Sequence, residues 1–183
     1  SNGPARAWWD VTFYDLNISI DVDRRTIEGW NDITYLVLDS ASEIQIDLQQ
    51  PMEIDSILQD GQALRYRRDG NAFFVELAAD QIVGQSKSIT AYYHGTPTAA
   101  QNPPWDGGFI WREDSSGGDW VATANQGLGA SVWWPTKDLQ SAEPDSQRVS
   151  ITAPDPLVDV SNGRLRSTTP NDDGTTTYEW FVT

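Results

Sequence analysis

The sequence contains no cysteine and only one histidine, His94. A chain without cysteine has no disulfide, no thiolate nucleophile and no thiolate metal ligand. A single imidazole cannot supply the two or three histidines of a catalytic zinc site. We therefore predict that this chain has no catalytic residue, no metal site and no cofactor of its own. Because no Ser or Cys motif accompanies His94, we interpret it as a structural histidine at a strand end with a hydrogen-bond partner.

Positive charge is also scarce, since 12 Lys and Arg stand against 27 Asp and Glu and the net charge is −15. This balance, with no basic stripe, argues against nucleic-acid partners and against anionic membrane surfaces. No apolar run approaches about 18 residues, so we expect no insertion into a membrane. The first residues lack the basic and apolar segments of a signal peptide. The acidic, cysteine-free composition favours the cell envelope or the exterior over the cytoplasm.

Alternating apolar and polar residues indicate β-strands along most of the chain. Residues 14–22 alternate as a strand with one solvent-facing side does, whereas Val11 and Phe13 lie in the opposite phase and predict a β-bulge or a change of sheet near Phe13. Hairpin turns are expected at Asp60-Gly61 and at residues 69–71. Further strands are expected at residues 26–38, 44–48, 54–57, 64–68, 73–77, 89–93, 148–151, 157–161, 164–167 and 175–182.

These strands recur about every 8–12 residues with turns between them, which is typical of an all-β protein. We predict an antiparallel β-sandwich or a pair of saddle-shaped sheets. Residues 95–147 are rich in Gly, Pro, Trp and Asp and should form hairpins and ordered loops. No linker or repeat divides the chain, so we predict one β-rich domain over residues 1–183.

Acidic residues are crowded in several loops, but their spacing does not define a metal site. Asp172-Asp173-Gly174 lacks the alternating oxygen ligands and the closing Glu of a calcium loop. We interpret this segment as a hairpin turn. The acids at positions 106, 114 and 119 are interpreted as solvated loop residues, with cation binding left open.

Nine tryptophans in one domain need an explanation, because Trp either fills a core or forms a stacking surface. We expect Trp111 and Trp120 to pack on each other across a hairpin. Trp133 and Trp134 are neighbours, and neighbouring strand residues face opposite sides, so we expect at most one of them in the core. Trp105, Trp133 or Trp134 could instead form a stacking platform of a stand-alone glycan-binding module, which is our alternative hypothesis.

Several motifs, in order along nearly the whole chain, resemble the N-terminal domain of aminopeptidase N-type (gluzincin) zinc metallopeptidases. They are the runs at 14–18 (YDLNI), 27–29 (IEG), 46–48 (IDL), 92–97 (YYHGTP), 107–111 (GGFIW), 124–138 (ANQGLGASVWWPTKD) and 160–165 (VSNGRL). The Trp-Trp-Pro-x-Lys-Asp form is similar to the bacterial branch of this family.

The resemblance implies a β-rich domain that caps a separate catalytic domain and walls its active-site entrance. That catalytic domain would carry the H-E-x-x-H helix that binds zinc and activates water, and neither that motif nor a second histidine occurs here. The family domain usually continues for some two dozen further residues, so its last strands are expected to lie beyond this sequence. The implied partners are the chain's own catalytic domain and a peptide substrate, and this chain alone should be inactive.

The resemblance also carries a role for one residue, Gln126. In the family, a Gln in the corresponding loop contacts the free amine and first side chain of the substrate. An amide oxygen suits this task because it accepts a hydrogen bond from an ammonium without adding charge. Gly127, Gly129 and Ala130 follow it and would permit close approach of the substrate, so we include them in the predicted substrate-binding site.

Overall fold

The computed structural model describes residues 2–183 of the chain. Thirteen strands, one short α-helix and one 3-10 helix follow each other along it. In chain order these elements are α1 (Pro4–Ala7), β1 (Trp9–Asp21), β2 (Thr26–Val37), β3 (Glu43–Asp47), β4 (Glu53–Gln59), β5 (Gln62–Ala63), β6 (Tyr66–Asp69), β7 (Ala72–Glu76), β8 (Ser86–Gly95), β9 (Gly108–Glu113), β10 (Asp119–Ala124), η1 (Ala130–Val132), β11 (Ser146–Pro154), β12 (Arg164–Pro170) and β13 (Thr175–Val182).

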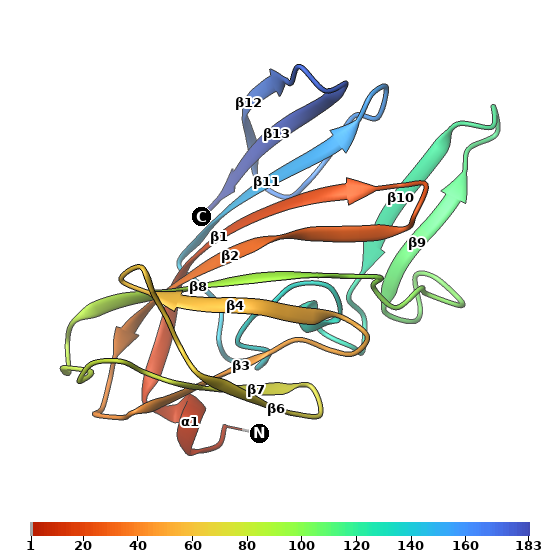
Figure 1. The fold of residues 1–183 in the computed structure, drawn as a ribbon. Coiled ribbons are helices and arrows are strands. Elements are labelled where there is room, and N and C mark those ends of the chain that lie inside the picture. The colour runs from red at the N-terminus through yellow and green to blue at the C-terminus, as the bar shows by residue number, and fades with distance from the viewer. Residues whose placement is uncertain (1) are drawn as a thin grey trace.

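Eight strands form one long twisted sheet in the order β12-β13-β11-β1-β2-β8-β4-β5 (Figure 1). Its pairs are antiparallel except for β1 and β11, which run parallel. The pairing of β1 with β11 joins residues 13–19 to residues 146–152, so an N-terminal strand and a strand from the C-terminal third of the chain lie side by side in this sheet. The all-β prediction is therefore confirmed, with one parallel pair that hairpin signals could not reveal.

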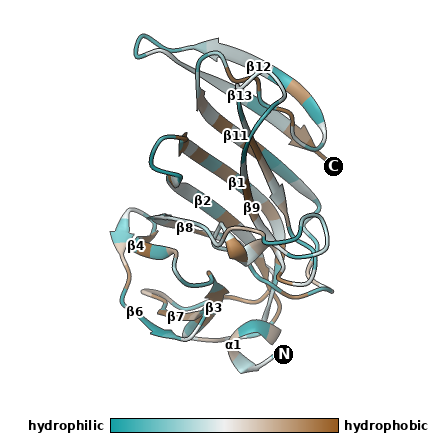
Figure 2. Ribbon diagram, turned by 90° about the vertical axis from the view of Figure 1, so that its right-hand side faces the viewer, coloured by the Kyte–Doolittle hydropathy of each residue, from teal (hydrophilic) through white to brown (hydrophobic). Residues whose placement is uncertain are grey.

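A smaller sheet, β3-β7-β6, packs against one half of the large sheet (Figure 1). The core lies between the two layers. Ile33 and Tyr35 of β2 are fully buried there, as are Ile44 and Ile46 of β3 and Val75 of β7. Strands β1, β2 and β11 show alternating hydrophilic and hydrophobic bands along their length (Figure 2), because successive side chains of a strand point to opposite faces.

The remaining pair, β9 and β10, forms a separate hairpin beside the large sheet (Figure 1). Trp111 lies opposite Val121 and Trp120 lies opposite Arg112. Directly opposed residues share a face and neighbours alternate, so the two tryptophans lie on opposite faces of the hairpin. The predicted packing of Trp111 on Trp120 is therefore wrong. Trp111 packs against Phe109 instead, with ring centroids 5.1 Å apart, and Trp120 is exposed.

Local signals in the sequence predicted most turns correctly. The bulge falls between Val11 and Phe13, and the Asp60-Gly61 and 69–71 turns close the β4–β5 and β6–β7 hairpins. The 171–174 turn joins β12 to β13, with the Asp173 carboxylate accepting a hydrogen bond from the backbone N–H of Thr175.

The predicted strand at residues 157–161 is wrong, since the chain there is irregular. In that segment the Asp159 carboxylate accepts a hydrogen bond from the Trp180 indole instead of the backbone entering a ladder. The sequence signals also missed the short helix α1, which begins at Pro4. Within residues 2–183, no helix has the length and apolar character needed to cross a bilayer.

Candidate functional site

The four predicted substrate-binding residues lie together in the loop between β10 and η1. Gln126, Gly127 and Leu128 form an exposed turn, and Ala130 begins η1. Gly127 and Gly129 have φ angles of +76° and +79°, a conformation that glycine adopts without strain. No hydrogen bond of the Gln126 side chain to another described residue is observed. Gln126 is exposed in this turn, so its amide is accessible to a ligand.

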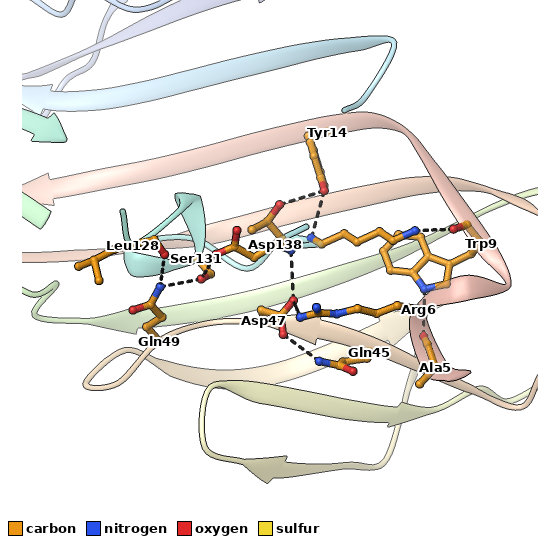
Figure 3. A network of polar contacts seen from close by, with 12 residues as sticks. Ala5, Arg6, Trp9, Tyr14, Gln45, Asp47, Gln49, Leu128, Ser131 and Asp138 are labelled. Atoms are coloured by element: carbon orange, nitrogen blue, oxygen red, sulfur yellow. Dashed lines mark hydrogen bonds and ion pairs between the residues drawn. The ribbon is translucent and has the colours of Figure 1, made fainter. Parts of the chain in front are cut away.

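Three polar side chains hold this loop from below (Figure 3). The Gln49 amide donates to the backbone carbonyl of Leu128 at 2.5 Å and to Ser131 Oγ at 3.0 Å. Ser131 Oγ in turn donates to the carboxylate of Asp138. At the start of the loop, the Trp133 indole donates to the Asn125 side chain at 3.1 Å. The turn that carries Gln126 is thus fixed at both ends by side chains outside it.

Gly129 is required at its position for steric reasons as well. A Cβ atom built there would lie 2.4 Å from both carboxylate oxygens of Asp138, and the φ angle of this residue is +79°. Contacts under 3.0 Å force a rearrangement, so any side chain at residue 129 would displace the Asp138 carboxylate from Ser131. By contrast, a Cβ at Gly127 meets no atom within 4 Å, so only its backbone conformation favours glycine.

A second layer of buried charge lies beneath Asp138 (Figure 3). The Asp47 carboxylate accepts a hydrogen bond from the Asp138 backbone N–H at 3.1 Å and from the Gln45 amide at 3.0 Å. It also forms an ion pair with Arg6, and both side chains are only 7% exposed. The backbones of Asp47 and Thr136 exchange two hydrogen bonds, which ties the segment after η1 to β3.

Tyr14 of β1 and Lys137, which follows η1, complete this support. The Tyr14 hydroxyl accepts hydrogen bonds from Thr136 Oγ1 at 2.9 Å and from the Lys137 backbone N–H at 3.1 Å. The Lys137 ammonium donates to the carbonyl of Trp9 at 2.5 Å and lies 4.3 Å from the centroid of the Trp9 ring. Burial lowers the pKa of Lys137. Burial raises the pKa of Tyr14 to about 12, because a phenolate there would be desolvated.

This perturbed phenol predicts alkaline destabilisation. Between pH 10 and 12 the unfolded chain loses the Tyr14 proton while the folded chain keeps it, so stability falls as pH rises. The stabilisation is fully present below pH 10, and a shift of this size corresponds to about 2–3 kcal/mol. We expect Tyr14→Phe to flatten the decrease of unfolding free energy with pH in this window, measured by urea denaturation. Tyr92→Phe, at the surface, is the matched control, and equal slopes for wild type and Tyr14→Phe would contradict the assignment.

Trp133 and Trp134 are both buried, with 8% and 7% of their surface exposed. The expectation that at most one of them is in the core is wrong. The two residues directly follow the 3-10 helix η1 and do not belong to a strand, so the alternation of faces does not apply to them. Trp134 packs edge-on against Tyr14 at 5.0 Å, and Trp133 packs against Phe109 at 5.7 Å. Of the three tryptophans considered for a stacking platform, only Trp105, at 79% exposure, is exposed at the surface.

His94 lies at the end of β8 and has a polar partner, as predicted. The Nδ1 atom of His94 lies 2.7 Å from the carboxylate of Asp55, which belongs to β4. Among residues 2–183, no three His, Asp or Glu side chains are grouped closely enough to hold a metal ion. The loop acids Asp106 and Asp114 accept backbone hydrogen bonds within their own loops instead. The residues present therefore do not fit a zinc site.

No model of a known protein family matches this sequence, and no curated protein matches it. Solved structures do match. An M1 zinc metallopeptidase from Deinococcus radiodurans covers 97% of this chain with a TM-score of 0.78 and 20% sequence identity. Native leukotriene A4 hydrolase from Saccharomyces cerevisiae covers 95% of it with a TM-score of 0.72 and 16% identity.

These matches use only part of the other proteins. The chain spans 39% of the Deinococcus metallopeptidase and 27% of the yeast hydrolase. It thus has the fold of the N-terminal domain of M1 zinc metallopeptidases. A mutant of the Deinococcus metallopeptidase was solved with a Tyr-Ser-Ala substrate, and a two-domain M1 zinc metallopeptidase mutant was solved with L-arginine.

Sequence reasoning located the loop but not its supports. Gln49 is 79 positions from Leu128, and Asp47 is 91 positions from Asp138. No local spacing connects residues so far apart, and Arg6 comes from a helix that the sequence signals missed. The one sequence signal for these supports was the run of residues 133–138, which resembles a structural turn. Asp138, at its end, contacts both Ser131 of the upper layer and Asp47 of the lower layer.

Proposed function

We propose that this chain is the non-catalytic N-terminal domain of a zinc-dependent aminopeptidase. It walls the entrance of the active site and presents Gln126 to the free amino terminus of the peptide substrate. The observation that carries the proposal is the exposed turn at residues 126–128, held rigidly by Gln49, Ser131 and Asp138. The fold likeness over 97% of the chain supports the same assignment.

The chemistry of the loop fits a substrate ammonium group. The Gln126 amide oxygen accepts a hydrogen bond from an ammonium, and its amide N–H groups remain available to a carbonyl. A side chain that contacts substrate must be held in place, because loose positioning costs rate. The turn meets this condition through contacts that do not use Gln126 itself. The net charge of −15 would also attract a positively charged amino terminus.

Zinc belongs to the proposed catalytic domain, not to this chain. When bound there it would supply a Lewis acid and an activated water for peptide hydrolysis. The part assigned to residues 2–183 is to bind and orient one end of the substrate and to close one wall of the site. We accordingly expect the isolated chain, supplemented with zinc, to show no hydrolysis of aminoacyl substrates. Hydrolysis that scales with the purity of the chain would overturn this proposal.

The decisive test replaces Gln126 in the full-length enzyme. We expect Gln126→Ala to lower kcat/KM for a dipeptide substrate about 10- to 100-fold, because a hydrogen bond to a charged group is lost. The pH profile of the zinc-bound enzyme should keep its shape, since Gln126 does not titrate. Steady-state kinetics on a substrate series with different first residues would measure both effects.

Gln62→Ala is the matched control, because Gln62 lies exposed on the edge strand β5. It should leave kcat/KM unchanged. Gln126→Glu should retain part of the affinity, since a carboxylate also accepts from an ammonium. A folded Gln126→Ala enzyme with wild-type kcat/KM would refute the role of Gln126, and a parent gene without an H-E-x-x-H motif would refute the aminopeptidase assignment as a whole.

A further inference from the structure

The outer face of the large sheet, turned away from the core, carries the aromatic side chains of Trp30 and Tyr92 among polar neighbours. Trp30 of β2 lies directly opposite Tyr92 of β8, so both rings stand on the same face. Tyr92 is 38% exposed and Trp30 is half-buried. Asn31 beside Trp30, and Ala91 and Tyr93 on either side of Tyr92, are buried on the core face, so both rings stand on the face away from the core. No ring–ring contact of either residue is observed in the described part of the chain.

The side chains around these rings are short and polar. On β1, Asn17 lies opposite Trp30, and Ser19 lies opposite Glu28. On β11, Ser150 and Thr152 continue the same two rows. Together they offer hydroxyl, amide and carboxylate groups at the regular spacing of the strands, about 4.8 Å apart.

A shallow hollow of about 460 Å³ lies among these residues. Its lining includes Trp30, Tyr92, Asn17, Ser19, Glu28 and Asp55. Asp55 belongs to a bulge of β4, between Ile54 and Ser56, and its carboxylate is held by His94 at 2.7 Å. A bulge re-aims the side chain of its extra residue, here toward the aromatic pair. The volume lies within the range of small-ligand sites.

We propose that this hollow binds a neutral oligosaccharide of β-linked hexopyranose units. A sugar ring with equatorial hydroxyls has apolar C–H faces that stack on Trp and Tyr, while its edges hydrogen-bond to amide, hydroxyl and carboxylate groups. Trp30 and Tyr92 supply two adjacent stacking positions, and Asn17, Glu28 and Asp55 supply the polar groups. This site is separate from the Gln126 loop and does not depend on the aminopeptidase assignment.

The charge around the hollow selects among sugars. Glu28 and Asp55 are both exposed there, and the chain carries a net charge of −15. Anionic glycans are therefore repelled, whereas neutral ones are not. Because hydrogen bonding and stacking dominate, binding of the neutral glycan should change little between low and high salt.

The test titrates the 183-residue chain with cellohexaose by calorimetry and by Trp fluorescence. We expect saturable binding that Trp30→Ala and Tyr92→Ala each weaken at least about fivefold. Trp30→Phe and Tyr92→Phe keep an aromatic ring and should retain most of the affinity. They also show whether a loss of binding in the Ala variants comes from the missing ring or from unfolding. Trp105→Ala is the matched control, since Trp105 is exposed in the loop between β8 and β9, outside the lining of the hollow, and should not affect binding.

Three results would overturn the proposal. The first is the absence of saturable cellohexaose binding at millimolar concentration by a folded wild-type chain. The second is an equal loss of affinity in Trp105→Ala and in the two sheet variants. The third is preferential binding of a tetralysine peptide that needs the same two rings and weakens with salt, which would make this face a cation-binding surface instead.

Discussion

Asp47→Ala is expected to lower the free energy of unfolding by about 3–5 kcal/mol. The Asp47 carboxylate neutralises Arg6 where both side chains are 7% exposed, and it also accepts from the Asp138 backbone and the Gln45 amide. Removing it takes the Asp47 negative charge away from a buried guanidinium and leaves the Asp138 backbone N–H without its carboxylate acceptor. Chemical denaturation followed by Trp fluorescence would measure the loss.

Two further variants make this prediction specific. Asp47→Asn keeps an acceptor for the Asp138 N–H but removes the charge, so it should recover only part of the stability. Asp21→Ala breaks the solvent-exposed ion pair with Arg24, whose side chains are 41% and 81% exposed, and should change stability by less than about 1 kcal/mol. A similar cost for Asp47→Ala and Asp21→Ala would show that the buried pair does not stabilise the domain.

Trp134→Ala is expected to cost a further 3–5 kcal/mol or so, the range for a large aromatic removed from a core. Its ring packs on Tyr14 at 5.0 Å and on Trp133 at 6.0 Å, so the change also loosens the contacts of Tyr14 with Thr136 and Lys137. Trp134→Phe refills much of the space and should restore part of the stability. In thermal denaturation, the melting temperature should fall in the order wild type, Trp134→Phe, Trp134→Ala.

Trp105→Ala is the control for the tryptophan series, because Trp105 is 79% exposed. Its replacement should leave stability within about 0.5 kcal/mol of wild type. If Trp134→Ala were equally neutral, Trp134 would be free to act at the surface, and the stacking platform that Trp134 was considered for would be the better explanation of this segment.

The two expected losses bear on the proposed function through the same loop. Asp47 holds Asp138 by its backbone, and Asp138 holds Ser131, which shares the Gln49 amide with Leu128. We expect a partial loss of this support to move the Gln126 turn before the domain unfolds, since loops have few buried contacts of their own. In the full-length enzyme, Asp47→Asn should therefore reduce kcat/KM even at temperatures where the protein remains folded.

Most of the strands, the bulge at Val11 and Phe13 and the hairpin turns could be predicted from the sequence, because these features depend on residues close together in the chain. The sequence also indicated the loop that carries Gln126 and the turn at residues 133–138. Its errors share one cause. The strand at 157–161, the pairing of Trp111 with Trp120 and the exposure of Trp133 or Trp134 were all judged by alternation, which holds only where a strand exists and its register is known.

The contacts between distant strands and the contacts that support the Gln126 loop could not be predicted from the sequence. The parallel pairing of β1 with β11, the ion pair of Arg6 with Asp47 and the hold of Gln49 on Leu128 connect residues that are distant in sequence. Such contacts depend on the relative placement of whole sheets, and no local pattern encodes it. The same holds for Trp30 and Tyr92. They are 62 positions apart in the sequence, and the register of β2 with β8 places them side by side.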